Sequence, residues 1–302
     1  MKIKISCWFR SARVLALAAV FAGLLAGCKV LPHDSAAAFT SSVATTRTQS
    51  QQAFDAINDL VAEGSIGYAA SQPHLLETNI LTGLDPRGEQ AWDRILQALG
   101  KYGQHLQALT APEFTKPFEE EAENLGGELK TVGKDLQTNG FLSQAPQITP
   151  ALASAFAAVG DLILEARAQA HAQKIARAAD PHIGHICQTL ADSIGTGPTN
   201  GLRGTVFQHW NDLLAEKKND FLTAPDAAAK RKIAADFAAL LQRRAAQDQV
   251  LISLQHSLLK LAELHHALAN GQSWTIKNAT AAIAAEAQRG SDLYNRFNAK
   301  LN

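Results

Sequence analysis

The chain has 302 residues, of which 46% are hydrophobic, 19% charged and 6% aromatic, and it carries 28 basic and 28 acidic side chains. This composition is too apolar for a disordered chain, and the length is sufficient for a folded core. Ala is abundant, runs of Val, Ile and Thr are nearly absent, and Gly and Pro cluster between periodic stretches, which favours helices over sheets. We therefore predict an all-α fold, an elongated antiparallel bundle of about six to eight helices with coiled-coil-like heptad seams.

The first 27 residues have the features of a secretory signal peptide. A basic head precedes the apolar stretch Val14–Leu25, whose 12 residues are too few to span a membrane as a mature helix. The leader ends in Leu25-Ala26-Gly27-Cys28, which resembles the lipobox of bacterial lipoproteins. The alternative is an ordinary signal peptide that a cysteine happens to follow.

The lipobox resemblance implies that the leader is cleaved before Cys28 and that Cys28 becomes lipidated, so membrane lipid is a partner of the mature protein. In enteric-type sorting an Asp after this cysteine retains a lipoprotein in the inner membrane. Lys29 at that position therefore indicates the periplasmic face of the outer membrane. We expect residues 28–38 to form a lipidated linker and residues 39–302 a helical bundle, either one unit or two sub-bundles with a boundary near residues 140–150.

Loss of the leader removes four basic and no acidic residues, which leaves 24 Lys and Arg against 28 Asp and Glu, a net charge of −4. A nucleic-acid-binding protein would show a basic excess, so we exclude that class. Cys7 leaves with the leader and Cys28 is lipidated, so Cys187 is the one thiol that remains and no intramolecular disulfide is expected. We expect Cys187 to be buried as a small hydrophobic side chain.

Apolar spacing predicts the helices up to residue 222 in order, over residues 39–61, 92–109, 125–136, 152–170, 183–194 and 206–222. The Gly-, Pro- and Asn-containing stretch from Gly64 to Gly88 has room for one short helix. Pro181 is expected to interrupt the helical pattern, because the residue before a proline avoids the helical region. Residues 195–201 are Gly-rich but lack the sequence of a phosphate-binding loop, so we interpret them as a connector.

Two nearly identical phrases, LTAPE at residues 109–113 and LTAPD at residues 222–226, have the pattern of a capping box. In this interpretation Thr110 and Thr223 are helix N-caps, with Glu113 and Asp226 three residues later. The apolar positions around the two phrases do not align, so they indicate helix starts rather than an internal repeat.

The longest helix is expected to begin at Thr223 and to end at Asn270-Gly271. Its heptad seam contains Ile233, Phe237, Leu240, Arg244, Gln247, Leu251, Leu254, Leu258, Leu261, His265 and Leu268. We expect the polar entries, Arg244, Gln247 and His265, to fix the helix register. A last helix from Ser273 has the same spacing, and the short link predicts that it folds back antiparallel.

Candidate metal ligands occur in two places. His182, His185 and Cys187, together with His171, combine imidazole and thiolate groups that suit zinc or copper. His185 and Cys187 lie on different helix faces, so capping and partial burial are the preferred interpretation. His265 could hold a metal or haem between helices, but a neutral core histidine bonded to a neighbour is preferred. We predict no metal and no cofactor.

The sequence contains no G-x-S-x-G, no H-E-x-x-H and no serine with a placed histidine, so we predict no catalytic residue and no enzyme. We predict an outer-membrane-anchored helical lipoprotein that acts as an interaction or structural module for an envelope protein partner. The alternative is a ligand-binding bundle that holds a metal, haem or apolar molecule near His265 or His185.

Overall fold

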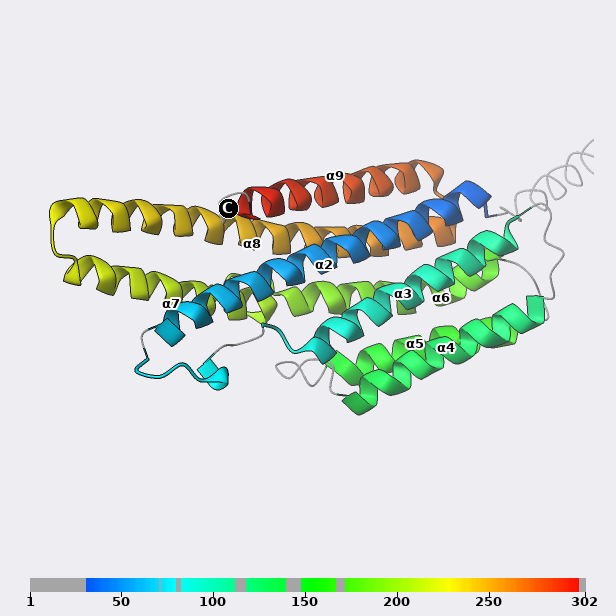
Figure 1. The fold of residues 1–302 in the computed structure, drawn as a ribbon. Coiled ribbons are helices and arrows are strands. Elements are labelled where there is room, and N and C mark those ends of the chain that lie inside the picture. Colours follow the sequence, from blue (N-terminus) through cyan, green and yellow to red (C-terminus); the bar gives the residue numbers. More distant parts are fainter. Residues whose placement is uncertain are drawn as a thin grey trace, which may run out of the picture.

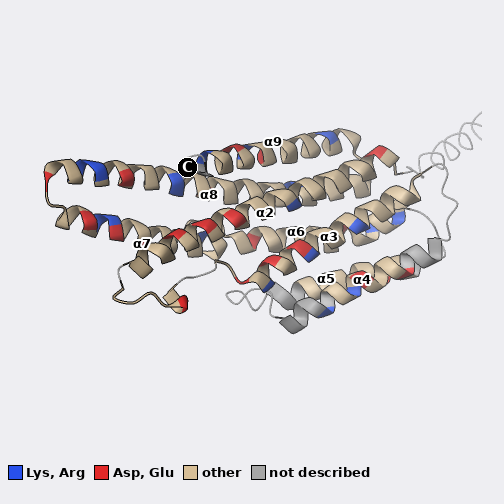
Figure 2. Cartoon of the chain, viewed as in Figure 1, with Lys and Arg blue, Asp and Glu red and all other residues tan. Residues whose placement is uncertain are grey.

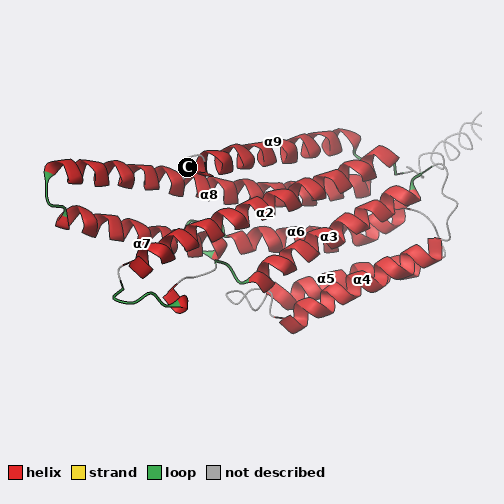
Figure 3. Ribbon diagram, in the orientation of Figure 1, coloured by secondary structure: helices red, strands yellow, loops and turns green. Residues whose placement is uncertain are grey.

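The computed structural model describes residues 31–70, 72–79, 83–111, 118–139, 148–166 and 172–298, and within them every regular element is helical (Figure 1, Figure 3). The elements are α2 (His33–Ala70), the short 3-10 helix η1 (Glu77–Asn79), α3 (Pro86–Leu109), α4 (Phe118–Asn139), α5 (Ile148–Ala166), α6 (Ala172–Ile194), α7 (Gly201–Thr223), α8 (Ala227–Asn270) and α9 (Ser273–Asn298). The predicted all-α bundle is confirmed for this part of the chain.

The longest helix, α8, organises the molecule. Its 44 residues make a rod of about 66 Å, which runs along the length of the bundle (Figure 1). The second part of α8 packs against α2, α6 and α9, and its first part pairs with α7. The far part of this α7–α8 pair projects past the other helices in Figure 1, and we call the pair, Gly201–Leu240, the arm. Helices α4 and α5 pair with each other and join the bundle through α3 and α6.

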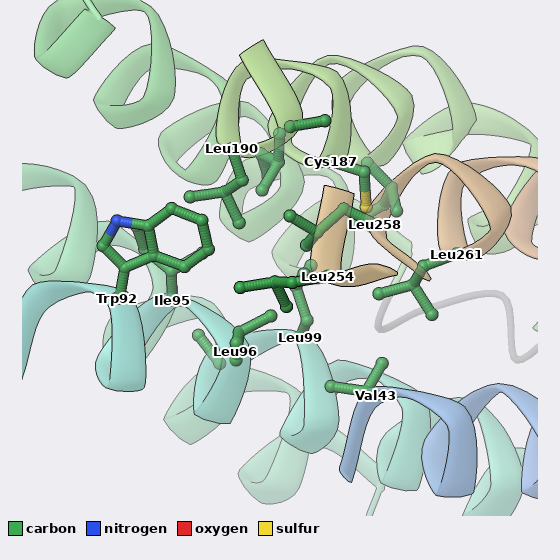
Figure 4. Packing of buried hydrophobic residues seen from close by; sticks show 14 of the residues in the cluster. Val43, Trp92, Ile95, Leu96, Leu99, Cys187, Leu190, Leu254, Leu258 and Leu261 are labelled. Carbon is green, nitrogen blue, oxygen red and sulfur yellow. The ribbon is translucent and has the colours of Figure 1, made fainter. Parts of the chain in front are cut away.

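Apolar side chains from most of the helices form one buried cluster. Figure 4 shows Leu99 of α3, Cys187 of α6 and Leu258 of α8 pointing into the same interior, and all three are fully buried. Because each buried CH₂ group stabilises the fold by about 0.8 kcal/mol, the packing of these faces holds the helices together. The cluster contains residues that precede and residues that follow the predicted boundary at positions 140–150. The division of the bundle into two sub-bundles stays a prediction.

The apolar seam of α8 is buried along its second part, from Gln247 to Leu268. Ile233 and Phe237 lie in the arm and are half-buried. Further buried positions of α8 lie outside the predicted seam, namely Arg243, Val250, Ser253, Ser257, Leu264, Ala267 and Ala269. Helices pack on several sides of α8, so its buried surface is wider than the two-position stripe of a coiled coil.

The predicted turn between the last two helices is confirmed. Gly271 adopts the left-handed conformation with φ of 66°, and its N–H donates to the carbonyl oxygens of Ala267 and Leu268. Glycine fits this position because it lacks the Cβ atom that makes the left-handed region costly for other residues. Helix α9 then returns along α8, antiparallel to it (Figure 1).

The predicted interruption at Pro181 is wrong, because α6 continues through it from Ala172 to Ile194. A proline inside a helix costs about 3 kcal/mol, since it lacks an N–H and its ring crowds the preceding turn. Pro181 is exposed, whereas Ile183 and Ile186 on the same helix are buried. Each such burial contributes about 1.5–3 kcal/mol, so packing outweighs the local preference.

Both capping-box assignments are wrong. Thr110 is the C-cap of α3, and its hydroxyl donates to the carbonyl oxygen of Gln107. Thr223 is the last residue of α7, and its hydroxyl donates to the carbonyl oxygen of Asn219. Asp226 is the N-cap of α8, where its carboxylate accepts from the N–H of Ala229 at 2.8 Å. Aspartate is a better N-cap than threonine, so α8 begins after Asp226, at Ala227.

The first described helix is longer than its predicted range at both ends. Helix α2 begins at His33, inside the predicted linker of residues 28–38, and it ends at Ala70. It therefore continues through Gly64 and Gly67, which the sequence placed in a loop. Leu31, just before the helix, is already buried with 2% exposure. The short helix expected between Gly64 and Gly88 is η1.

Candidate functional site

The proposed lipidation residue, Cys28, lies outside the described residues, as does His171. The remaining candidate metal ligands of the first group lie on α6 but face different ways. His185 is exposed, His182 is half-buried, and Cys187 is fully buried in the core (Figure 4). Burial raises the pKa of the Cys187 thiol to about 12. Within the described residues no three His, Cys, Asp or Glu side chains form a group that could hold a metal ion.

His265 is fully buried, and both of its ring nitrogens are hydrogen-bonded. Its Nδ1 lies 3.0 Å from Oδ1 of Asp180, and its Nε2 lies 2.9 Å from the hydroxyl of Tyr102. The edge of the Phe39 ring contacts the imidazole, with ring centroids 5.3 Å apart. His266, at the surface, bonds the other oxygen of Asp180 at 2.7 Å. A chain of polar groups therefore leads from the surface into the core.

The charges of this chain are set by burial and hydrogen bonding. Burial lowers the pKa of His265, against the opposing effect of Asp180, so the imidazole is neutral. A neutral ring donates from one nitrogen, and because a carboxylate can only accept, Nδ1–H donates to Asp180 and Nε2 accepts from Tyr102. Burial acts to raise the pKa of Asp180, but hydrogen bonds from His265 and His266 hold it below its usual value. With both nitrogens engaged, His265 has no lone pair free for a metal or haem.

A second polar cluster joins α2, α7 and α8 at the base of the arm. Arg243 places its guanidinium against Glu63, with N–O distances of 2.9 and 2.6 Å, and over the ring of Trp210. Gln247 accepts from the indole N–H of Trp210 and donates to the carbonyl oxygen of Ala56 at 2.8 Å. Gln247 is buried, as predicted for a polar seam residue.

The predicted seam residue Arg244 is only half-buried, and the neighbouring Arg243 is the buried arginine of α8. The guanidinium of Arg244 instead lies over the ring of Phe207, 5.3 Å from its centroid. The sequence pattern missed this difference because Glu63 and Trp210, which bind Arg243, are far from it in the chain.

A concavity lies where the end of α2, η1 and α7 meet. This cleft has a volume of about 650 Å³, which is in the range of small-molecule sites. Helix α2 contributes Leu60, Val61 and Tyr68 to its wall, and α7 contributes Asp212 and Glu216. We call it the distal cleft, because α2 reaches it at the end opposite to His33 (Figure 1).

The two walls of the distal cleft, α2 and α7, come very close to each other at Gly67. A Cβ atom placed on Gly67 would lie 2.8 Å from Oε2 of Glu216. The absence of a side chain therefore allows the Glu216 carboxylate to lie directly against α2. Gly64, one turn earlier, also lines the cleft. Each of these two glycines inside a helix is less favourable than Ala by about 1 kcal/mol.

Exposed large apolar side chains gather around the distal cleft and on the adjoining arm. In the described part of the chain seven such residues are exposed, and six of them lie there: Ile66, Tyr68, Leu75, Leu76, Phe221 and Leu222. Leu75 and Leu222 are the most open of the six, at 77% and 76%. Apolar side chains that cluster on a surface mark an interaction site more often than single ones do.

The charge around the distal cleft is acidic. Asp212 and Glu216 lie one turn apart on α7, and neither forms an ion pair with another described residue. Figure 2 marks further acidic residues in the second half of α2. Burial, followed by the nearby Asp55 carboxylate, raises the pKa of Asp59 on this helix. A cationic group in the cleft would be attracted by the Asp212 and Glu216 carboxylates that line it.

No protein-family model matches the chain, and no curated protein or solved structure is significantly similar to it. The candidate site therefore depends on geometry and chemistry. No sequence pattern predicted the distal cleft, although the adjacent Leu75 and Leu76 in a Gly- and Pro-containing stretch were a signal for it.

Proposed function

We propose that this protein is a lipid-anchored helical lipoprotein of the bacterial cell envelope that holds a protein-binding surface away from the membrane. The lipobox-like sequence ending at Cys28 supports the anchor, and Lys29 supports the periplasmic face of the outer membrane. No described helix is long and apolar enough to cross a bilayer. The proposed partner is an envelope protein that binds the distal cleft.

The observation that carries the proposal is the distance between the two ends of α2. His33 lies five residues after Cys28, and Tyr68 of the distal cleft lies 35 residues further along the same helix. At 1.5 Å per residue this separation is about 52 Å. An anchor at one end and an exposed apolar surface at the other suit a spacer that presents a docking site.

The chemistry of the distal cleft defines the partner that it would bind. Exposed Leu75 and Leu76, which lie just before the η1 wall of the cleft, favour aliphatic or aromatic anchors. The carboxylates of Asp212 and Glu216 in the lining favour a neighbouring Lys or Arg. We therefore expect a protein segment in which a basic residue stands beside apolar ones. An acidic segment would be repelled.

Metabolic labelling tests the anchor. Cells that produce the wild-type protein or the Cys28→Ala variant are grown with labelled palmitate, and the purified proteins are compared. The wild type should incorporate the label and the variant should not. Equal incorporation by both proteins, or none by either, contradicts the assignment of Cys28.

Site-specific photocrosslinking tests the docking surface. A photoreactive amino acid replaces Leu76 at the cleft, or Ala285 on the exposed face of α9 as the control. The Leu76 probe should capture a partner that the Ala285 probe does not. In the Leu76 probe protein, the double change Asp212→Lys and Glu216→Lys should abolish the crosslinked product, whereas the control change Asp292→Lys should leave it intact. A crosslinked partner segment without Lys or Arg, or capture that survives the double charge reversal, refutes the proposal.

The ligand-binding alternative receives less support from the geometry. The site that it invoked at His265 is filled by Phe39, Tyr102 and Asp180. His185, the other position considered, is exposed on α6.

A further inference from the structure

The seventh exposed apolar side chain, Trp274, lies far from the distal cleft. It occupies the second position of α9 and is 78% exposed. Lys277, one turn later, is exposed as well. Ile276, which lies between the two, and Ala279, which follows Lys277, are buried. The first turn of α9 thus presents an aromatic ring and a cation on its outer face.

The register of α9 against α2 places Trp274 at the same end of the bundle as the start of the described chain. The two helices run in the same direction (Figure 1). They meet where the Gln49 side-chain amide donates to the carbonyl oxygen of Glu286 at 3.3 Å, beside Gly290. Trp274 precedes Gly290 by 16 residues, and His33 precedes Gln49 by 16. Both lie about 24 Å back along their helices, so they are level.

The chain between this end of the bundle and Cys28 is short. Leu31 is buried with 2% exposure, which fixes it to the bundle. It follows Cys28 by three residues, and three extended residues span at most about 11 Å. A diacylglycerol group on Cys28 would therefore hold this end of the bundle directly against the bilayer surface.

We propose that Trp274 and Lys277 contact the phospholipid headgroup region and so orient the bundle on the membrane. The inference rests on the proposed lipidation of Cys28. Tryptophan is enriched at membrane–water interfaces because its ring is apolar and its N–H is polar. Lys277 adds a cation that an anionic headgroup attracts. With this contact made, the distal cleft faces away from the bilayer, at the far end of α2.

Tryptophan fluorescence gives a direct test, since Trp274 is the exposed one of three tryptophans that follow the leader. Trp92 and Trp210 are 3% and 0% exposed, so they provide an internal background. The mature lipidated protein is reconstituted into vesicles of phosphatidylethanolamine and phosphatidylglycerol, with or without brominated acyl chains. The bromines should quench most of the Trp274 emission, and Trp274→Phe should remove the quenched component.

A tryptophan at the other end of the molecule is the matched control. In the Trp274→Phe background, Leu76→Trp introduces an exposed ring at the distal cleft, and its emission should remain unquenched. The inference is overturned if the protein floats with the vesicles while Trp274 stays unquenched, or if the Leu76→Trp ring is quenched equally. Failure to float refutes the lipid anchor itself and, with it, this inference, so the two failures are distinguishable.

Discussion

Replacing Tyr102 by phenylalanine should destabilise the fold through a single lost hydrogen bond. Tyr102 and His265 are both fully buried, and the tyrosine hydroxyl is the donor that satisfies Nε2 of His265 at 2.9 Å. The Tyr102→Phe change keeps the ring but leaves that nitrogen without a partner in the core. A buried polar group that loses its partner costs about 1–3 kcal/mol. We expect the free energy of unfolding to fall by that amount.

The prediction can be measured by urea and thermal unfolding of the Cys28→Ala protein without its leader, followed by circular dichroism at 222 nm. A loss of 1 kcal/mol lowers the melting temperature by roughly 2–4 °C in a protein of about this size. Tyr294→Phe is the matched control, because Tyr294 is only half-buried near the end of α9. Its effect should stay within about 0.5 kcal/mol.

A double-mutant cycle shows whether the hydrogen bond is the cause. Removing both partners, with Tyr102→Phe and His265→Leu together, should cost less than the sum of the two single changes, by about 0.5–3 kcal/mol. Tyr102→Phe with unchanged stability, or strictly additive costs, would refute the reasoning that the Tyr102 hydroxyl satisfies His265.

Three further predictions concern α6 and the residues that it contacts. Burial lowers the pKa of His265 in the folded state. Below the ordinary histidine pKa of about 6.5, His265 of the unfolded chain therefore takes up a proton that the folded state does not, and the free energy of unfolding should fall as the pH drops from about 6.5 toward 5. Denaturant titrations should show a smaller fall in this range for His265→Gln. The lowered pKa of Asp180 should also make stability fall as the pH drops, but only below about 3.8, so the pH ranges of the two effects are separable. Cys187, whose pKa is raised to about 12 by burial, should react with a thiol reagent only after unfolding in the Cys28→Ala protein, and rapid labelling of the native state would disprove its burial. Pro181→Ala should raise the free energy of unfolding by about 1–2 kcal/mol, because it restores a helix N–H at an exposed position; a lower melting temperature for this variant would count against that account.

Some features that depend on a single helix could be predicted from the sequence. Gly271 ends α8 because its left-handed conformation is a property of that residue and the turn before it. The periodic apolar positions of α8 predicted its buried face, including Gln247 and His265. For the same reason the buried state of Cys187 was predictable, since it shares a helix face with apolar neighbours.

Only the tertiary structure decided which residues meet across the bundle. Helix α6 continues through Pro181, and Arg243 rather than Arg244 is buried. His265 is hydrogen-bonded to Tyr102 and Asp180. Each outcome depends on contacts between residues dozens of positions apart, whose energies exceed the local preferences that a sequence pattern reports. The distal cleft and the level of Trp274 with His33 have the same origin. Both follow from how helices are placed against one another, which no stretch of neighbouring residues encodes.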